Sequence, residues 1–147
     1  MTAALLATFG GRADCLRLLM AAECDIEAAT SGQRLTPALL ATLGGHDDCL
    51  TLLIAAGCDI EARDFNGCTP AMFAAVTGDC DRLATLIDAG CNIDAMTAGG
   101  ASMDTAAHVD CARILSHERA RRSALLAARS LDEATLAALK TKRPRKL

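Results

Sequence analysis

The chain has 147 residues, of which 52% are hydrophobic, 22% charged and 2% aromatic, with a net charge of −3. This composition excludes a disordered chain and provides enough apolar side chains for the core of one ordinary domain. No apolar run approaches the roughly 18 residues of a membrane span, and no basic segment precedes the first apolar stretch as in a signal peptide. Because aromatic residues are scarce, we expect a core of Ala, Leu, Ile, Cys and Met, which favours helices.

The first predicted element is an Ala- and Leu-rich helix that ends at Gly10-Gly11. Its apolar residues Leu5, Leu6 and Phe9 have no segment before them that would cover them. Two interpretations stay open: this end of the fold is partly exposed, or the chain descends from a longer array of similar elements.

The next elements form a pair of helices and an extended arm. Thr36 can cap a helix, Pro37 suits its first turn, and the segment TPALLATLGG ends in two glycines. A second helix, HDDCLTLLIAAG, follows with acids at its N-terminus, where the helix dipole favours them. The arm at 58–68 contains Asn66-Gly67, a strong turn signal.

This pattern repeats along the chain. Thr36-Pro37 recurs as Thr69-Pro70 at a spacing of 33 (69 − 36), and Cys58 recurs as Cys91 at the same spacing. The segment HDDCLTLL returns near the end as HVDCARIL, in a shortened last unit. We therefore predict four units, at residues 1–35, 36–68, 69–101 and 102–117.

The repeating unit resembles the ankyrin repeat. Residues 64–79, DFNGCTPAMFAAVTGD, follow that family's pattern D-x-x-G-x-T-P-x-x-x-A-A-x-x-G, and the resemblance covers about the first 117 residues. It implies an all-α, ankyrin-type α-solenoid of stacked helix-turn-helix units with finger connections. The His of the family's T-P-L-H motif is replaced by Leu39 and Met72, so we expect apolar stacking there instead of a hydrogen-bond network.

The C-terminal part differs in charge. Residues 1–115 contain 6 Arg and 15 acidic residues, whereas residues 116–147 contain 9 basic and 3 acidic residues. Ser130 and Glu133 have the spacing of a capping box, which predicts a final helix within a C-terminal helical cap at 118–139. The alternative for this helix is docking on a partner. The basic tail at 140–147 is either a solvated terminus or a nuclear-import signal.

The eight cysteines do not indicate metal or disulfide chemistry. No CxxC pair occurs, and His108 with Cys111 has no second pair beside it, so no metal site is predicted. Cysteines at equivalent repeat positions would lie about 8–10 Å apart, beyond the roughly 7 Å limit for a disulfide. Cys24, Cys58 and Cys91 are instead predicted to be small buried residues, and Cys68 to be exposed, as an ordinary or a reactive thiol.

Catalysis finds no support in the residue pattern. A nucleophile, a base and an orienting group must converge, but the three His residues lie in or just after second-helix patterns. No glycine-rich phosphate loop occurs. We predict a protein that is not an enzyme and needs no cofactor.

The resemblance implies that another protein binds to the finger tips and to the helix positions that face them. Phe65 is the first choice for an anchor, because aromatic side chains are enriched among binding hot spots; packing against a neighbouring finger is the alternative. Arg34 and Arg63 would pair with an acidic partner segment or with Asp64. The residues so assigned are Ser31, Gln33, Arg34, Leu35, Leu43, Arg63, Phe65, Asn66, Cys68, Val76, Thr77, Met96 and Thr97.

Three functions remain open at this point. The first is an interaction module or scaffold that is monomeric and cytoplasmic, does not contact membranes and does not bind nucleic acid, because the repeat region is acidic. The second is an adaptor or nuclear regulator that uses the C-terminal helix and the basic tail. The third is a thiol redox sensor.

Overall fold

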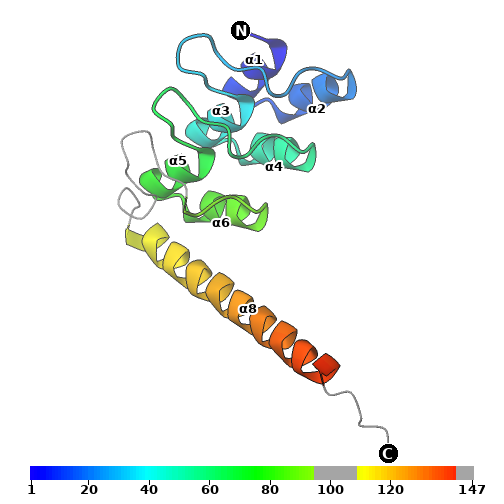
Figure 1. Ribbon diagram of the computed structural model, residues 1–147. Coiled ribbons are helices and arrows are strands. Elements are labelled where there is room, and N and C mark those ends of the chain that lie inside the picture. Colours follow the sequence, from blue (N-terminus) through cyan, green and yellow to red (C-terminus); the bar gives the residue numbers. More distant parts are fainter. Residues whose placement is uncertain (95–108, 142–147) are drawn as a thin grey trace, which may run out of the picture. The chain divides into compact units, whose positions relative to one another are not determined.

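The computed structural model describes residues 1–94 and 109–141, with side chains described for 1–94 and 110–130. Within these residues all regular structure is helical, as predicted. Contacts divide the chain into two units, Met1–Ile114 and Leu115–Leu147. The helices are α1 (Ala3–Phe9), α2 (Ala13–Ala21), α3 (Pro37–Gly44), α4 (Asp47–Ala55), α5 (Pro70–Thr77), α6 (Cys80–Asp88) and α8 (Val109–Thr141), as shown in Figure 1.

The first helix of each pair begins at a capping threonine. The hydroxyl oxygens of Thr2, Thr36 and Thr69 accept hydrogen bonds from the backbone N–H groups three residues on, each at 3.4 Å. Pro follows at the first helical position in α3 and α5. Gly45 and Gly78 end these two helices in the left-handed conformation. The start and end signals seen in the sequence therefore act as predicted.

The cysteine that recurs after each second helix closes that helix. The N–H groups of Cys24, Cys58 and Cys91 donate to carbonyl oxygens of Leu19, Leu53 and Leu86 at 3.0–3.1 Å. The side chains of Cys58 and Cys91 are buried, which confirms their predicted role, whereas that of Cys24 is only half-buried.

The helices stack in two columns. Figure 1 shows α1, α3 and α5 in one column and α2, α4 and α6 in the other, and contacts join α1 to α3, α3 to α5 and α2 to α4. Leucines fill the space between the columns, and their side chains are almost fully buried: Leu5, Leu16, Leu39, Leu50, Leu53, Leu83 and Leu86. Leu39 and Met72, which replace the family's histidine, are both buried in α3 and α5.

Helix α8 continues past the position where a new helix was predicted. Ser130 lies within α8, and its hydroxyl donates to the carbonyl oxygen of Ala127 at 2.8 Å. The predicted capping box at Ser130 is therefore wrong. The reason is that no Gly or Pro interrupts residues 109–141, so that the helix has no local stop signal. The fourth unit, the cap at 118–139 and the tail at 140–147 stay predictions.

Candidate functional site

One face of the repeat region carries exposed apolar side chains at a fixed position of each unit. Phe9, Leu43 and Val76 are spaced by 34 (43 − 9) and 33 (76 − 43) residues and lie in the last turns of α1, α3 and α5. Their exposed fractions are 65%, 44% and 53%. We call these three residues the apolar ladder. Thr8, Thr42 and Ala75, which precede these residues directly in the same turns, are buried, so the ladder positions lie on the opposite, solvent-facing side of each first helix.

The finger at 58–68 brings Phe65 next to this ladder. A groove of about 300 Å³ is lined by residues of two fingers and of the first helices: Gln33, Leu35, Leu43, Asp64, Phe65, Asn66 and Phe73. The Phe65 side chain is 75% exposed. Its backbone N–H donates to the carbonyl oxygen of Gln33 at 3.0 Å and thereby joins the two fingers. The backbone of Phe65 is thus held in place while its ring faces solvent.

Asp64 holds the finger tip in shape. One carboxylate oxygen, Oδ1, accepts from the N–H groups of Asn66 and Cys68 at 2.9 and 2.8 Å. Gly67 takes a φ of 80°, which completes the predicted Asn66-Gly67 turn. Arg63 closes the tip from outside, where its guanidinium donates to the Gly67 carbonyl oxygen at 3.1 Å. The tip is therefore a rigid support for Phe65.

The preceding finger is built in a different way. The Thr30 hydroxyl oxygen accepts from the Leu35 N–H at 3.0 Å, and the Arg34 N–H donates to the Thr30 carbonyl oxygen at 3.1 Å. Arg34 adopts a left-handed φ of 56°, which is unusual for a residue with a side chain. Its side chain is exposed on the finger.

Most residues assigned to the site from sequence lie on the surface. Leu35 and Cys68 are half-buried. Met96 and Thr97 lie outside the described residues. The exposed members are Ser31, Gln33, Arg34, Leu43, Arg63, Phe65, Asn66, Val76 and Thr77.

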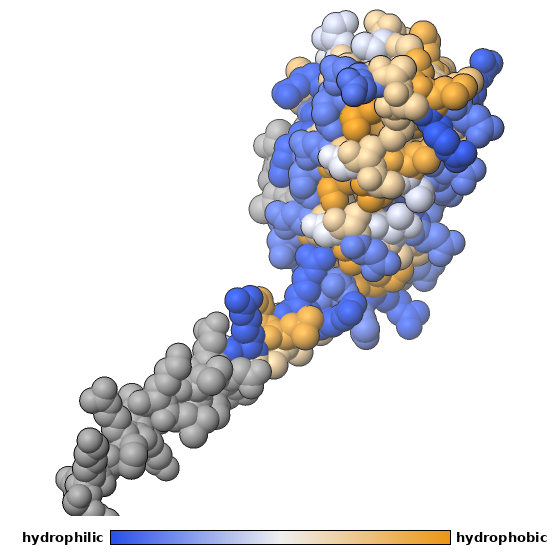
Figure 2. All heavy atoms as spheres, turned by 90° about the vertical axis from the view of Figure 1, so that its right-hand side faces the viewer, coloured by the Kyte–Doolittle hydropathy of each residue, from blue (hydrophilic) through white to orange (hydrophobic). Residues whose placement is uncertain are grey.

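A second apolar band runs along the side on which the second helices end (Figure 2). Exposed apolar residues at the C-terminal ends of α2 and α4 include Leu18, Ala22, Ala55 and Ala56. Because alanine offers little area to a partner, this band is a weaker candidate than the groove beside Phe65.

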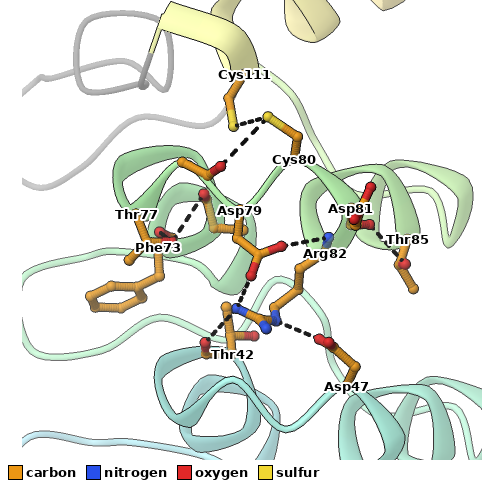
Figure 3. A network of polar contacts seen from close by, with 12 residues as sticks. Thr42, Asp47, Phe73, Thr77, Asp79, Cys80, Asp81, Arg82, Thr85 and Cys111 are labelled. Carbon is orange, nitrogen blue, oxygen red and sulfur yellow. Dashed lines mark hydrogen bonds and ion pairs between the residues drawn. The ribbon is translucent and has the colours of Figure 1, made fainter.

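Arg82 forms a buried network that the sequence reading missed (Figure 3). Its guanidinium contacts Asp47 at 2.7 Å and Asp79 at 2.8 Å, and donates to the Thr42 carbonyl oxygen at 3.2 Å. Only 8% of its side chain is exposed. The sequence signal was an aspartate three residues before the arginine, with an aspartate at the start of the preceding second helix. The network ties α6 to α3 and α4, across the junction between the units that carry Leu43 and Val76.

Cys68, Cys80 and Cys111 lie in surroundings that the sequence did not predict. The structure has eight free thiols. Cys68 was expected to be exposed, whereas the structure places it half-buried. Burial and then the Asp64 charge raise its pKa, against a smaller lowering effect of Arg63. The sulfur atoms of Cys80 and Cys111 lie 3.0 Å apart (Figure 3), a pair that the sequence reading did not identify. Burial, with the hydrogen bond to Cys80, raises the pKa of Cys111 to about 12.

Among the residues that the structure describes, no group of three or more His, Cys, Asp or Glu side chains is arranged to hold a metal ion. In the same residues, no helix has the length and apolar character required to cross a membrane.

Comparison with known proteins agrees with the architecture. The family model described as ankyrin repeats matches residues 1–97 in three copies, which is more than half of the chain. No curated protein matches the sequence. The predicted fourth unit at 102–117 lies beyond the matched residues. Ankyrin repeats are generally protein–protein interaction modules. With its capped helix pairs, its fingers and the matched family model, this chain belongs to the ankyrin-repeat family.

Proposed function

We propose that this protein is a non-catalytic, cytoplasmic interaction module that binds a partner protein through its finger tips and the apolar ladder. The observation that carries this proposal is the exposed Phe65 ring beside the groove of about 300 Å³. A large apolar side chain on a rigid tip loses little conformational entropy on binding, which suits it as an anchor.

The charges around the groove suggest the chemistry of the partner. Arg34 and Arg63 are exposed on the fingers of an otherwise acidic repeat region. We propose that they favour an acidic segment that carries an apolar residue for the groove. Such charges at the rim mainly increase the rate of association and the specificity.

Affinity capture from the native cell extract tests this function. Phe65→Ala should reduce capture of the partner by about ten-fold or more, since truncation of a hot spot costs about 2 kcal/mol. Leu18→Ala is the matched control, because Leu18 is 73% exposed but lies on α2. The far-UV circular dichroism of both variants should equal that of the unchanged chain. Unchanged capture by Phe65→Ala and by Arg63→Glu would exclude the groove as the binding site.

The alternative is an adaptor or nuclear regulator in which the C-terminal region makes a second contact. Its support is the basic sequence KTKRPRKL at 140–147. Deletion of residues 140–147 should then move a fluorescently labelled chain from the nucleus to the cytoplasm. An unchanged distribution would count against an import signal.

A thiol redox sensor is the third candidate because the Cys80 and Cys111 sulfur atoms lie 3.0 Å apart. With oxidised glutathione as the oxidant, one thiolate attacks its disulfide and releases one glutathione thiol. The second protein thiol loses its proton, attacks the mixed disulfide and releases the second glutathione. The products are a Cys80–Cys111 disulfide and two glutathione thiols.

Intact-mass measurement tests this candidate. Treatment with oxidised glutathione should lower the mass by about 2 Da in the unchanged chain and in Cys15→Ser. Cys80→Ser should not show this loss. An unchanged mass with eight titratable thiols would exclude the sensor.

A further inference from the structure

The surface of α1 and α2 that points away from α3 and α4 is an apolar hollow. It has a volume of about 420 Å³ and is lined by Ala3, Leu6, Ala7, Gly10, Arg12, Cys15 and Leu19. We call these seven residues the end face. Leu6 is 56% exposed, and the Cys15 thiol is exposed.

The same repeat positions are covered in the units that follow. Leu6, Ala7, Cys15 and Leu19 correspond, 34 residues later, to Leu40, Ala41, Cys49 and Leu53, whose exposed fractions are 7%, 0%, 0% and 0%. A further 33 residues on, Ala74 and Leu86 are 0% exposed and Arg82 is 8% exposed, while Phe73, the equivalent of Leu40, is half-buried. The side chains of the end face therefore resemble those that are packed between neighbouring units within the repeat region.

Two contacts identify what covers these positions. His46 corresponds to Arg12, and its Nε2 lies 3.1 Å from the carbonyl oxygen of Phe9, the last residue of α1. Arg82 corresponds to Cys15 and donates to the carbonyl oxygen of Thr42 in α3 at 3.2 Å. Both side chains reach back to a carbonyl near the C-terminus of the preceding first helix. An ankyrin-type helix pair is thus the occupant at both internal junctions.

Arg12 gives the end face a cationic side chain, as Arg82 does at the second junction. It is exposed and stands at the edge of the apolar hollow. The carbonyl groups at a helix C-terminus carry partial negative charge, which a guanidinium stabilises. The end face thus offers apolar side chains from two helices and a cation for the end of a third helix.

We propose that the end face is the docking site for a further ankyrin-type helix pair, stacked in register with the two junctions inside the chain. Its first helix packs on Leu6 and Ala7 and ends at Arg12, and its second helix covers Cys15 and Leu19. This site is separate from the groove beside Phe65 and does not depend on the function proposed for that groove.

The Cys15 thiol is the probe for this site, in a variant that is extended by one repeat at its N-terminus. In this extended chain a copy of residues 36–68 is placed directly before Thr2, so that Thr2 follows the copy as Thr69 follows residue 68 in the unchanged chain. Alkylation of Cys15 by iodoacetamide, followed by peptide mass spectrometry, should slow by about ten-fold or more, because a covered thiol reacts only when the junction opens. Cys24, which is half-buried, is the internal reference.

Two variants of the extended chain control for local effects. Leu6→Asp should restore fast alkylation of Cys15, because it places a charge in the junction. Leu18→Asp should leave Cys15 protected, because its repeat equivalents, Leu52 and Thr85, are half-buried and exposed in covered units. Phe65→Ala should also leave Cys15 protected, which separates this test from that of the groove.

Three results would overturn the proposal. The first is that Cys15 is alkylated as fast in the extended chain as in the unextended chain, even if the circular dichroism shows that the added repeat is helical. The second is protection that survives Leu6→Asp. The third is slower alkylation of Cys15 in the unextended chain as its concentration rises from about 1 μM to about 1 mM, since the occupant would then be a second copy.

Discussion

Gly11 and Gly44 leave room for a single side chain, the ring of His46. A Cβ atom added at Gly11 would lie 2.6 Å from Nδ1 of that ring, and one added at Gly44 would lie 2.5 Å from Nε2. Gly11 also has a left-handed φ of 64°. The ring needs this room because it reaches across the first junction to the Phe9 carbonyl oxygen. Backbone geometry and packing together thus favour glycine at position 11, and packing against the His46 ring favours it at position 44.

Gly11→Ala should lower the free energy of unfolding by about 1–3 kcal/mol, because it adds left-handed strain and displaces His46. Urea denaturation followed by circular dichroism measures this change. Gly32→Ala is the control, since an added Cβ there meets no atom within 4 Å. Equal midpoints for the two variants would contradict the argument.

Cys58 should make stability depend on pH in the alkaline range. Burial, and then the charges of Glu27 and Asp59, raise its pKa from 9.0 to about 11 in the folded chain. The native state therefore holds its proton more tightly, so this stabilisation is complete below pH 9 and is lost as pH rises towards 11. A shift of this size corresponds to on the order of 2 kcal/mol.

Urea denaturation between pH 8 and pH 11 measures this effect. The chain has no tyrosine, so no phenol contributes to the change of stability in this range. Cys58→Ala should show a smaller loss of stability over the range than the unchanged chain. If the free energy of unfolding falls equally with pH in both proteins, Cys58 does not contribute to the pH dependence.

At the scale of elements, each first helix depends on a threonine cap, and each second helix on the turn that follows it. The cap was predictable because it is local: Thr and Pro act within four residues. The helix start predicted from Ser130 and Glu133 was wrong, because α8 runs through this position. A capping box acts only where the chain enters a helix, and here helix-favouring residues precede Ser130 without a break.

Thr69→Ala should destabilise the chain by about 1 kcal/mol, because the N–H of Met72 loses its cap. Thermal unfolding followed by circular dichroism measures the effect. Thr51→Ala is the matched control, since Thr51 is exposed in the middle of α4 and caps no helix. An equal change in both variants would show that the cap contributes little.

At the scale of the whole repeat region, stability depends on the junctions between units as well as on the units themselves. Arg82 is the main polar contact across the junction between the second and third units, where it joins Asp47, Asp79 and the Thr42 carbonyl oxygen. Because the apolar ladder spans the same junction, this network also holds the candidate binding face in register.

Arg82→Met should lower the free energy of unfolding by about 1–3 kcal/mol and broaden the transition, because the units become less coupled. The loss should stay below that of a fully buried pair, since 68% of the Asp47 side chain is exposed and its charge can be hydrated. Arg17→Met is the control: its pair with Asp14 is exposed at both ends, so we expect less than about 0.5 kcal/mol. A sharp transition with an unchanged midpoint would contradict this role.

The repeat, its period, the helix pairs, the caps at Thr36 and Thr69 and the turn at Asn66-Gly67 could all be predicted from the sequence alone, because each shows in short local patterns of residues. The sequence also indicated Phe65 and the helix positions that form the face beside it. The contacts across junctions could not be predicted in this way: Arg82 meets Asp47, Cys80 meets Cys111, and His46 meets the Phe9 carbonyl oxygen. These partners are about one repeat apart in sequence, so the stacking of the units alone brings them together.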